Sequence, residues 1–327
     1  MNKFLSVIIP KFKESEQDIF PLLTSIYNQL GVDLEDIEVI ICNDAGGSGP
    51  VDGNFLNLFQ GLEISQIDLD ENKGPGGARQ AGIDNAKGQY LMFCDADDIL
   101  HSIGVLGALM QEAGKDVPDI LASSWLEEVK DENGIHYLTH KYENTWMHGK
   151  LIRRQFLLQN NIRHHPDLRV HEDSYILAIA QALSQRTIYL DIISYVWRFN
   201  PNSITRRNGC SYTYDSMPVF IYACSEADRV IEQKKPEIME EKITQFCIYN
   251  YFIYHKPDWQ EAGHRQFLKA AEEAFVKFIK PFWHYWKSTS QELKRKIYNA
   301  ERTKHFGGLI ENETLEQWIG KIGIEKE

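Results

Sequence analysis

Short apolar runs alternate with segments of helical periodicity in the first part of the chain. Residues 5–9 form an apolar run closed by Pro10, which is typical of a strand buried on both faces. Apolar positions then recur at helical spacing from 19 to 30, ahead of Gly31, which predicts a helix. Runs at 38–42 and 89–94 predict further strands, with helices expected over 78–86 and through Leu106 to Met110. This order predicts an α/β fold, a Rossmann-like, mostly parallel sheet with helices on both faces.

The strand pattern stops near residue 207. Beyond it, apolar positions follow helical spacing around 220–231, 243–254 and 267–279. We therefore expect two domains, residues 1–207 with the α/β sheet and residues 208–327 as a helical appendage. The aromatic side chains of the appendage are expected to form its core; the alternative is a surface for acceptor binding or oligomerisation.

Composition narrows the class of protein. The length of 327 residues is enough for one large or two ordinary domains, and the net charge of −12 excludes a globally basic nucleic-acid binder. The five cysteines form no C-x-x-C pair, so we expect free thiols in a reducing compartment. No apolar stretch approaches the ~18 residues of a membrane span, and the first ten residues do not resemble a signal peptide. The chain is expected to be cytoplasmic.

Carboxylates gather where the third predicted strand ends. Asp95, Ala96 and Asp97 follow the run 89–94 and form a D-x-D motif, with Asp98 next to it. Two such carboxylates supply hard oxygen ligands for Mn²⁺ or Mg²⁺, whose shell water and a substrate diphosphate would complete. The alternative is that these acids only cap the following helix.

A glycine-rich segment precedes the D-x-D motif. Residues 72–79 read Asn-Lys-Gly-Pro-Gly-Gly-Ala-Arg and lead into a predicted helix, so backbone N–H groups, Lys73 and Arg79 can face phosphate oxygens. The segment is not G-x-G-x-x-G, because Arg79 holds the sixth position, and Gly149-Lys150 lacks the remainder of a P-loop. These absences argue against a dehydrogenase and a P-loop ATPase. The alternative reading is an ordinary glycine turn with two solvated cations.

A second acidic pair, Glu172 and Asp173, opens a strongly apolar predicted helix. It either caps that helix or supplies a carboxylate general base. The segment from His148 to His171 reverses the local charge, with five basic residues against Asp167 alone. Such a segment is either a solvated face or a seat for an anionic substrate, and its four histidines support a zinc site only weakly. The basic residues are Lys150, Arg153, Arg154, Arg163 and Arg169.

Together these segments resemble the inverting glycosyltransferases of family 2, which have the GT-A fold. The resemblance covers residues 4 to 207 and rests on segments 6–14, 39–44, 72–82, 88–98, 149–154 and 172–173. It implies that residues 1–207 are a catalytic domain that moves a sugar from a nucleotide-diphosphate sugar, preferably a UDP-sugar, to an acceptor hydroxyl with inversion. Two positions depart from the family pattern: Lys13 replaces Asn, and Asn43-Asp44-Ala45-Gly46 replaces Asp-Asp-Gly-Ser.

The resemblance also implies roles for single residues. Asp173 would be the catalytic base with Glu172 beside it, and Asp97 would ligate the metal, Mn²⁺ or Mg²⁺, together with Asp95. Phe12 would lie against the base of the nucleotide, Asp44 would hydrogen-bond a uracil, and the segment from Tyr195 would close over the diphosphate. The expected donor-binding set is Pro10, Phe12, Glu14, Asp44, Lys73, Gly74, Arg79, Asp95, Ala96, Arg198 and Ser203.

The acceptor is less defined than the donor. We expect a polysaccharide, a teichoic-acid-like polymer or another phosphate-bearing acceptor, facing Trp146, Lys150 and His171. A nucleic-acid acceptor is not favoured, and the sequence is compatible with a homo-oligomer. Two alternatives stay open: a metal-dependent phosphohydrolase or nucleotidyltransferase, and a non-catalytic module that binds a sugar nucleotide. Against the phosphohydrolase, Asp98-Ile99 lacks the Gly-Thr pair usual after a phosphatase nucleophile motif.

Overall fold

The structure is a computed structural model that describes all residues except 1–2, 142–144, 207–210, 262 and 325–327. The chain divides into two compact units, Met1–Pro201 and Asn202–Glu327. The domain boundary expected at residue 207 lies outside the described residues. Each unit has its own core and is described by itself.

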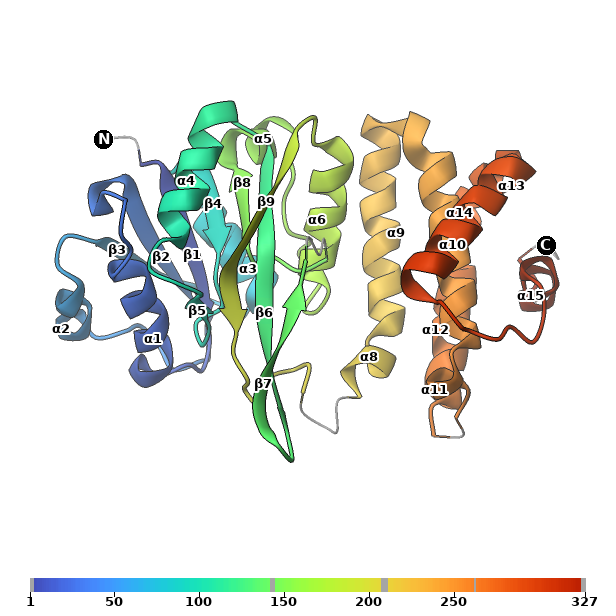
Figure 1. Cartoon of the computed structure of the whole chain (residues 1–327), viewed down its shortest axis with the longest axis horizontal. Coiled ribbons are helices and arrows are strands. Elements are labelled where there is room, and N and C mark those ends of the chain that lie inside the picture. The colour runs from blue at the N-terminus through green and yellow to red at the C-terminus, as the bar shows by residue number, and fades with distance from the viewer. Residues whose placement is uncertain (1–2, 142–144, 207–210, 262, 325–327) are drawn as a thin grey trace. The chain divides into compact units, whose positions relative to one another are not determined.

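The first unit is built on a nine-stranded mixed sheet in the order β3-β2-β1-β4-β8-β6-β9-β5, with β7 paired to β6 (Figure 1). Strands β1 to β4 are parallel, as expected, whereas β8 is antiparallel to both β4 and β6. The strands are β1 (Leu5–Lys11), β2 (Ile37–Asn43), β3 (Glu63–Asp68), β4 (Tyr90–Phe93), β5 (Ile99–Leu100), β6 (Ile120–Asp131), β7 (Gly134–His140), β8 (Lys150–Arg153) and β9 (Thr187–Trp197).

Helices cover both faces of this sheet, which confirms the expected fold class. The face that carries Val7 and Ile9 packs against α1 (Glu16–Tyr27) and α4 (Val105–Asp116), which lie in front of the sheet in Figure 1. The face that carries Ile8 packs against α3 (Gly74–Asn85), and a Cβ at Gly82 would lie 2.4 Å from Cγ2 of Ile8. The unit also contains α2 (Gly53–Leu56), α5 (Arg154–Gln159) and α6 (Glu172–Leu183).

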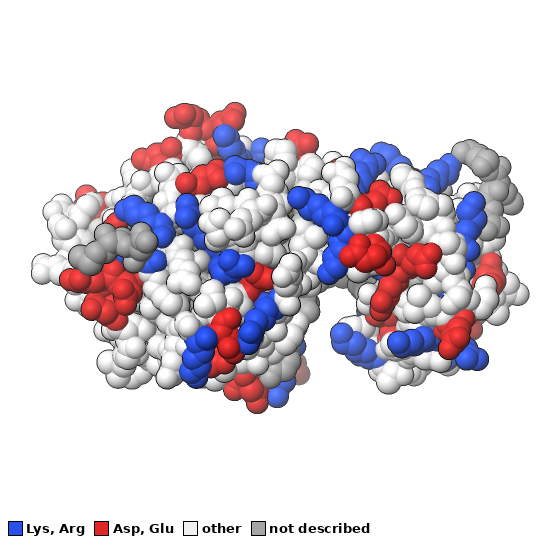
Figure 2. Space-filling view, turned by 90° about the horizontal axis from the view of Figure 1, so that it is seen from above, with Lys and Arg blue, Asp and Glu red and all other residues white. Residues whose placement is uncertain are grey.

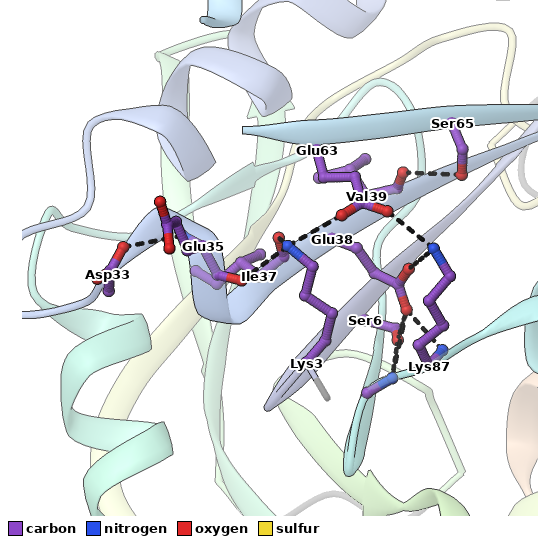
Figure 3. Close-up of polar contacts among 11 residues, drawn as sticks. Lys3, Ser6, Asp33, Glu35, Ile37, Glu38, Val39, Glu63, Ser65 and Lys87 are labelled. Atoms are coloured by element: carbon purple, nitrogen blue, oxygen red, sulfur yellow. Dashed lines mark hydrogen bonds and ion pairs between the residues drawn. The ribbon is translucent and has the colours of Figure 1, made fainter. Parts of the chain in front are cut away.

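A buried polar network ties the amino ends of the parallel strands together (Figure 3). Glu38 on β2 is only 2% exposed, and its carboxylate accepts hydrogen bonds from the Ser6 hydroxyl and the Lys87 backbone N–H, both at 2.6 Å. The Lys87 ammonium reaches Glu63 on β3 at 2.9 Å. These hydrogen bonds and the ion pair with Lys87 compensate the buried charge of Glu38, so the polar groups at this edge of the sheet have a structural role. The opposite, carboxyl edge carries the chemistry.

The second unit is helical, as expected, and its aromatic residues form its core. Tyr251, Phe252, Phe275 and Trp318 are each at most 1% exposed. Within the described residues, no helix has the length and apolar character needed to cross a bilayer, and Cys42, Cys94, Cys224 and Cys247 are free thiols; Cys210 lies outside that part. The helices are α8 (Tyr212–Asp215), α9 (Met217–Lys234), α10 (Met239–His255), α11 (Pro257–Gln260), α12 (Arg265–Ile279), α13 (Trp283–Ser288), α14 (Gln291–His305) and α15 (Leu315–Ile322).

Candidate active site

The candidate site lies where β1, β2 and β4 end side by side. The register pairs Lys11 with Asn43 and Ile8 with Phe93, so the residues that follow these strands meet at one edge of the sheet. Ligands of open α/β sheets bind at this edge, outside the carboxyl ends of the strands. The structure thus brings Asp44, after β2, and Asp95, after β4, to the same edge of the sheet with β1 between their strands, and both lie at strand ends as the sequence predicted.

Asp44 anchors the start of α3. Its two carboxylate oxygens accept the backbone N–H groups of Lys73 and Gly74, at 2.7 and 2.8 Å, and the residue is 5% exposed. Gly74 has φ +70°, a conformation that glycine adopts without strain. The carboxylate is therefore already engaged by backbone donors, and the expected contact with a uracil stays a prediction. The Lys73 ammonium lies 3.5 Å from Glu71 at the surface.

Backbone contacts fix the segment after β1. The Phe12 N–H donates to Glu14 at 2.7 Å, and the Phe12 carbonyl accepts the Ser48 N–H at 2.5 Å. A Cβ at Gly47 would lie 1.6 Å from the Phe12 carbonyl oxygen, so this approach requires glycine. Phe12, Glu14 and Pro10 are half-buried, which leaves part of each side chain exposed to a ligand.

Asp98 ties the D-x-D loop to the end of β9. Its carboxylate, which is fully buried, accepts the Tyr195 hydroxyl at 2.6 Å and the Arg198 N–H at 2.8 Å. The same hydroxyl accepts the Asp95 N–H at 2.9 Å. Asp97 accepts the side-chain amide of Asn200 at 2.7 Å. These contacts fix the backbone on which Asp95, Ala96 and Asp97 are carried.

The donor set around Asp95 suits a hard divalent cation. Ligand atoms of Asp95, Asp98 and His148 lie within 4.8 Å of one another, and Asp95 also belongs to the pair expected from the sequence. Burial acts to raise the pKa of Asp95, but the charge of Arg79 and the hydrogen bond from its guanidinium act against burial and that pKa is lowered, so the carboxylate is ionised at neutral pH. Carboxylate oxygens and a neutral imidazole are ordinary ligands of Mn²⁺.

The sequence analysis expects Asp95 and Asp97 as metal ligands, whereas the cluster that could hold a cation in the structure combines Asp95 with Asp98 and His148. Burial lowers the pKa of His148 to about 4, so the imidazole is neutral and keeps a lone pair at physiological pH. No spacing motif marked this histidine, because it reaches Asp95 only through the pairing of distant strands. Asp98 lies directly after the motif, and the sequence offers it no role beyond the alternative that all three acids cap the following helix.

Glu172 and Asp173 begin α6, where His171 adopts a left-handed conformation with φ +58°. Burial raises the pKa of Asp173 to about 7, and the neighbouring Glu172 charge adds to this; Arg79 and the Ser174 N–H act in the opposite direction. Burial also raises the pKa of Glu172. A carboxyl group that exchanges its proton near neutral pH has the property required of a general base.

Arg79 joins the two carboxylate groups. Its guanidinium is buried and contacts Asp95 at 2.7 Å and Glu172 at 2.6 Å. The sequence suggested that this side chain faces phosphate oxygens, and that role stays a prediction. Asp95 lies only 16 positions away in sequence, but Glu172 lies 93 positions away, so local pattern could not reveal the bridge between them.

The residues expected on the acceptor side lie in different environments. Lys150 is 1% exposed and its ammonium donates to the Trp146 carbonyl at 2.7 Å, so it offers little surface to an acceptor. Trp146 is half-buried, with its ring 5.1 Å from that of Trp197. His171 is half-buried, and Ser203 lies in the second unit, where its hydroxyl shares a hydrogen bond with Thr205.

Two of the five basic residues of the segment from His148 to His171 form ion pairs with acids of the same unit. Arg163 contacts Asp84 on α3 at 2.8 Å, and Arg153 is hydrogen-bonded to Asp119. On the face shown in Figure 2, acidic and basic side chains are interspersed, without a continuous coat of either sign. The excess of basic residues from His148 to His171 is therefore not by itself evidence of an exposed surface that binds an anionic substrate.

A mixed α/β sheet with acidic residues after its parallel strands and a second carboxylate pair at the start of α6 is the arrangement expected of the GT-A fold. Residues 6–168 match the model of the family described as glycosyl transferase family 2, and the chain belongs to that family. The expected enzyme class is thus confirmed. The two alternatives, a phosphohydrolase or nucleotidyltransferase and a non-catalytic module, are not what this family membership indicates.

Curated relatives are glycosyltransferases too. The chain is 27% identical to EpsJ of Bacillus subtilis over 229 residues, covering 63% of this chain and 64% of EpsJ. It is 32% identical over 126 residues to the GalNAc(5)-diNAcBac-PP-undecaprenol beta-1,3-glucosyltransferase of Campylobacter jejuni, covering 38% and 39% of the two chains. GlyA of Streptococcus pneumoniae matches over 31% of its length. The chain spans less than two thirds of each of these relatives.

Solved structures share the fold at low identity. TarS 1–349 of S. aureus in complex with UDP-GlcNAc superposes with a TM-score of 0.57 at 16% identity, covering 92% of both chains. The mannosyltransferase PcManGT of Pyrobaculum calidifontis, in complex with GDP-Man and Mn²⁺, gives a TM-score of 0.52 at 13% identity, covering 99% of this chain and 85% of PcManGT. These likenesses support the GT-A fold.

Proposed function

We propose that this chain transfers a sugar from a UDP-sugar to an acceptor hydroxyl, with inversion at the anomeric carbon and with the help of Mn²⁺ or Mg²⁺. The observation that carries the proposal is the carboxyl group of Asp173, whose pKa is raised to about 7 by burial and by Glu172, linked through Glu172 and Arg79 to Asp95 of the D-x-D loop. A base and a metal-binding motif in one cluster are what transfer from a sugar diphosphate needs.

Several of the proposed donor-binding residues lie at the carboxyl ends of the parallel strands. Phe12, Glu14 and Pro10 would line the nucleotide, and TarS, bound to UDP-GlcNAc, is a fold neighbour that supports a UDP-sugar. Asp95 and Asp97 would hold the divalent cation, and PcManGT, bound to GDP-Man and Mn²⁺, supports this use of the fold. When bound, the cation neutralises charge on the diphosphate leaving group.

Asp173 would remove the proton from the acceptor hydroxyl. As that oxygen forms its bond to the anomeric carbon, the bond from this carbon to the diphosphate oxygen breaks, and the electron pair leaves with the nucleotide diphosphate. Attack from the face opposite the leaving group in one displacement inverts the configuration. The Ser174 N–H, 2.7 Å from the Asp173 carboxylate, orients the base.

The acceptor we propose is a polysaccharide, a teichoic-acid-like polymer or another phosphate-bearing molecule. The name of the Campylobacter relative describes a glucosyltransferase with a diphosphate-linked acceptor, which supports a phosphate-bearing class. Trp146 and His171 would face it. The proposal includes a cytoplasmic location, which the free thiols in the described part of the chain support.

The test is a panel of sugar nucleotides incubated with the purified chain and Mn²⁺ or Mg²⁺, scored by release of the nucleotide diphosphate. We expect release of UDP from a UDP-sugar, and its loss on addition of EDTA. The Asp173→Asn variant should bind UDP with unchanged affinity and release none from the sugar donor. Phosphate release from simple monoesters, with no turnover of any sugar nucleotide, would refute the proposal.

A further inference from the structure

Arg79 contacts one carboxylate from each half of the candidate site. One terminal nitrogen lies 2.7 Å from Asp95, in the D-x-D loop after β4, and the other lies 2.6 Å from Glu172, the first residue of α6. Glu172 is next to Asp173, the proposed base. A single guanidinium therefore connects the metal-binding loop to the element that presents the base.

The surrounding backbone holds Arg79 in this place. α3 and α6 approach each other closely at their amino ends. A Cβ added at Gly76 would lie only 2.9 Å from Cγ of Glu172, so only glycine fits there. Gly74 accommodates the side chain of Arg169, which a Cβ there would meet at 2.9 Å. The Arg79 side chain is 7% exposed, so it has little freedom to turn toward another partner.

The charge of Arg79 is needed where it lies. Asp95, Glu172 and Asp173 all interact electrostatically with it, and burial makes their negative charges costly. The two terminal nitrogens of the planar guanidinium donate in fixed directions to two separate carboxylates, whereas a lysine ammonium is a point charge that cannot reproduce this fork. The geometry therefore specifies arginine at this position.

We propose that Arg79 is a positioning residue that holds Asp95 and Glu172 in register, so that metal binding and proton removal are coupled through one side chain that does not itself contact the donor. This inference rests on the proposed function and deepens it. It differs from the expectation drawn from the sequence, in which Arg79 binds the diphosphate directly.

A measurement of UDP binding without metal distinguishes direct contact of Arg79 with the diphosphate from positioning of the two carboxylates by Arg79. If Arg79 contacts the diphosphate, Arg79→Met removes a charge-assisted hydrogen bond and weakens metal-free UDP binding by about 10-fold or more. If Arg79 acts through the carboxylates, metal-free UDP affinity stays within about threefold, and the enhancement of binding by Mn²⁺ is what falls. Isothermal titration calorimetry with UDP, with and without Mn²⁺, measures both quantities.

Turnover provides the second readout. We expect Arg79→Met to lower kcat for UDP release by about 100-fold, in the range of a lost electrostatic contact in an active site. Arg79→Lys should restore part of kcat, because it keeps the charge and loses the fork. The matched control is Arg186→Met, which breaks an exposed ion pair of 2.8 Å with Asp116 in the same unit and should leave kcat and UDP affinity unchanged.

Coupling between Arg79 and Glu172 is tested by a double-mutant cycle with Glu172→Gln. The two losses in kcat should be far from additive, because each variant breaks the same bridge. If Arg79→Met does not fold, as judged by a cooperative thermal transition, Arg79→Lys carries the same calorimetric comparison. A tenfold loss of metal-free UDP affinity in either variant, or additive losses in the cycle, overturns the inference.

The wild-type chain distinguishes failure of this inference from failure of the proposed function. If it binds no UDP and turns over no UDP-sugar, the proposed function fails and the inference falls with it. If the wild type is active and only the variants depart from the expected pattern, the inference alone is wrong.

Discussion

Asp173 must meet two opposing demands. As a base it has to be ionised, yet burial and the adjacent Glu172 raise its pKa to about 7. Arg79 and the Ser174 N–H counteract that rise, so the carboxyl titrates close to physiological pH instead of far above it. Burial of the ionised carboxylate lowers the stability of the fold and makes the group more basic, and catalytic positions commonly combine these two effects.

The pH dependence of transfer follows from this pKa. Because only the deprotonated carboxylate accepts a proton, kcat/KM should rise with pH and reach half of its plateau near pH 7. Glu172→Gln removes a negative charge that raises the pKa, so its midpoint should move to lower pH. Rates of UDP release between pH 5.5 and 9 measure both, and a flat profile over this range contradicts the assignment of Asp173.

Residue identities were easier to predict than residue partners. The D-x-D spacing at a strand end points to Asp95, and the family resemblance assigns Asp173 the role of base, although capping is an alternative for both. The contacts of Arg79 with Glu172 and of Asp98 with Tyr195 could not be predicted, since these partners lie 93 and 97 positions apart in sequence and meet only in the folded unit. Lys150 was read as part of a cationic surface, but its ammonium is directed to backbone carbonyls.

Helix α3 shows how packing overrides local preference. The sequence predicts a helix from Ala78, because glycines at 74, 76 and 77 disfavour helical backbone, yet the helix starts at Gly74. Glycine allows close packing at two positions of this helix. α3 approaches β1 at Gly82 and α6 at Gly76, and a Cβ at either position would clash with the neighbouring side chain. This closeness brings Arg79 within reach of both of its carboxylate partners.

Gly82→Ala tests that close approach. A Cβ 2.4 Å from Cγ2 of Ile8 must displace α3 or the strand, at a cost of about 1–3 kcal/mol. Differential scanning fluorimetry should show a lower Tm, and turnover should fall with it. The control is Gly114→Ala in α4, where the added Cβ makes ordinary contacts at 3.8 Å and the Tm should hold or rise. Equal Tm values for the two variants would refute the packing argument.

The link between the D-x-D loop and β9 is a second element-scale prediction. Tyr195→Phe leaves the buried Asp98 carboxylate without one donor, so unfolding free energy should fall by about 1–3 kcal/mol. The Mn²⁺-dependent part of the thermal shift caused by UDP should fall as well, because Asp95 loses the hydroxyl that fixes its backbone. Tyr189→Phe, at an exposed position of the same strand, is the matched control. An unchanged UDP shift in Tyr195→Phe would show that the loop is held by other contacts.

The strands were predictable only in part. β1, β2 and β4 are continuous apolar runs buried on both faces, which local pattern detects. β3 is exposed or half-buried along its whole length, and the buried first half of β6 contains Ser123 and Ser124, so neither is a continuous apolar run in the sequence. The antiparallel half of the sheet depends on pairings between distant segments, such as β4 with β8.

At the scale of the molecule, the positions of the charged residues are more informative about ligand binding than the net charge. The first 209 residues hold 18 basic against 29 acidic side chains, and several of those acids form the candidate site. In the basic segment from His148 to His171, Arg153 and Arg163 form ion pairs with Asp119 and Asp84. The carboxylate cluster around Arg79 is therefore the main electrostatic feature of the site, and a bound cation suits it.

The stereochemistry of the product tests the central claim most directly. With a UDP-α-sugar as donor and Mn²⁺ at pH 8, proton NMR at early time points follows the anomeric configuration of the first product, whether the acceptor is a hydroxyl or water. A single displacement with Asp173 as base predicts a β-configured product from the wild type and none from Asp173→Asn. An α-configured product, or the same rate in the variant, would contradict this account.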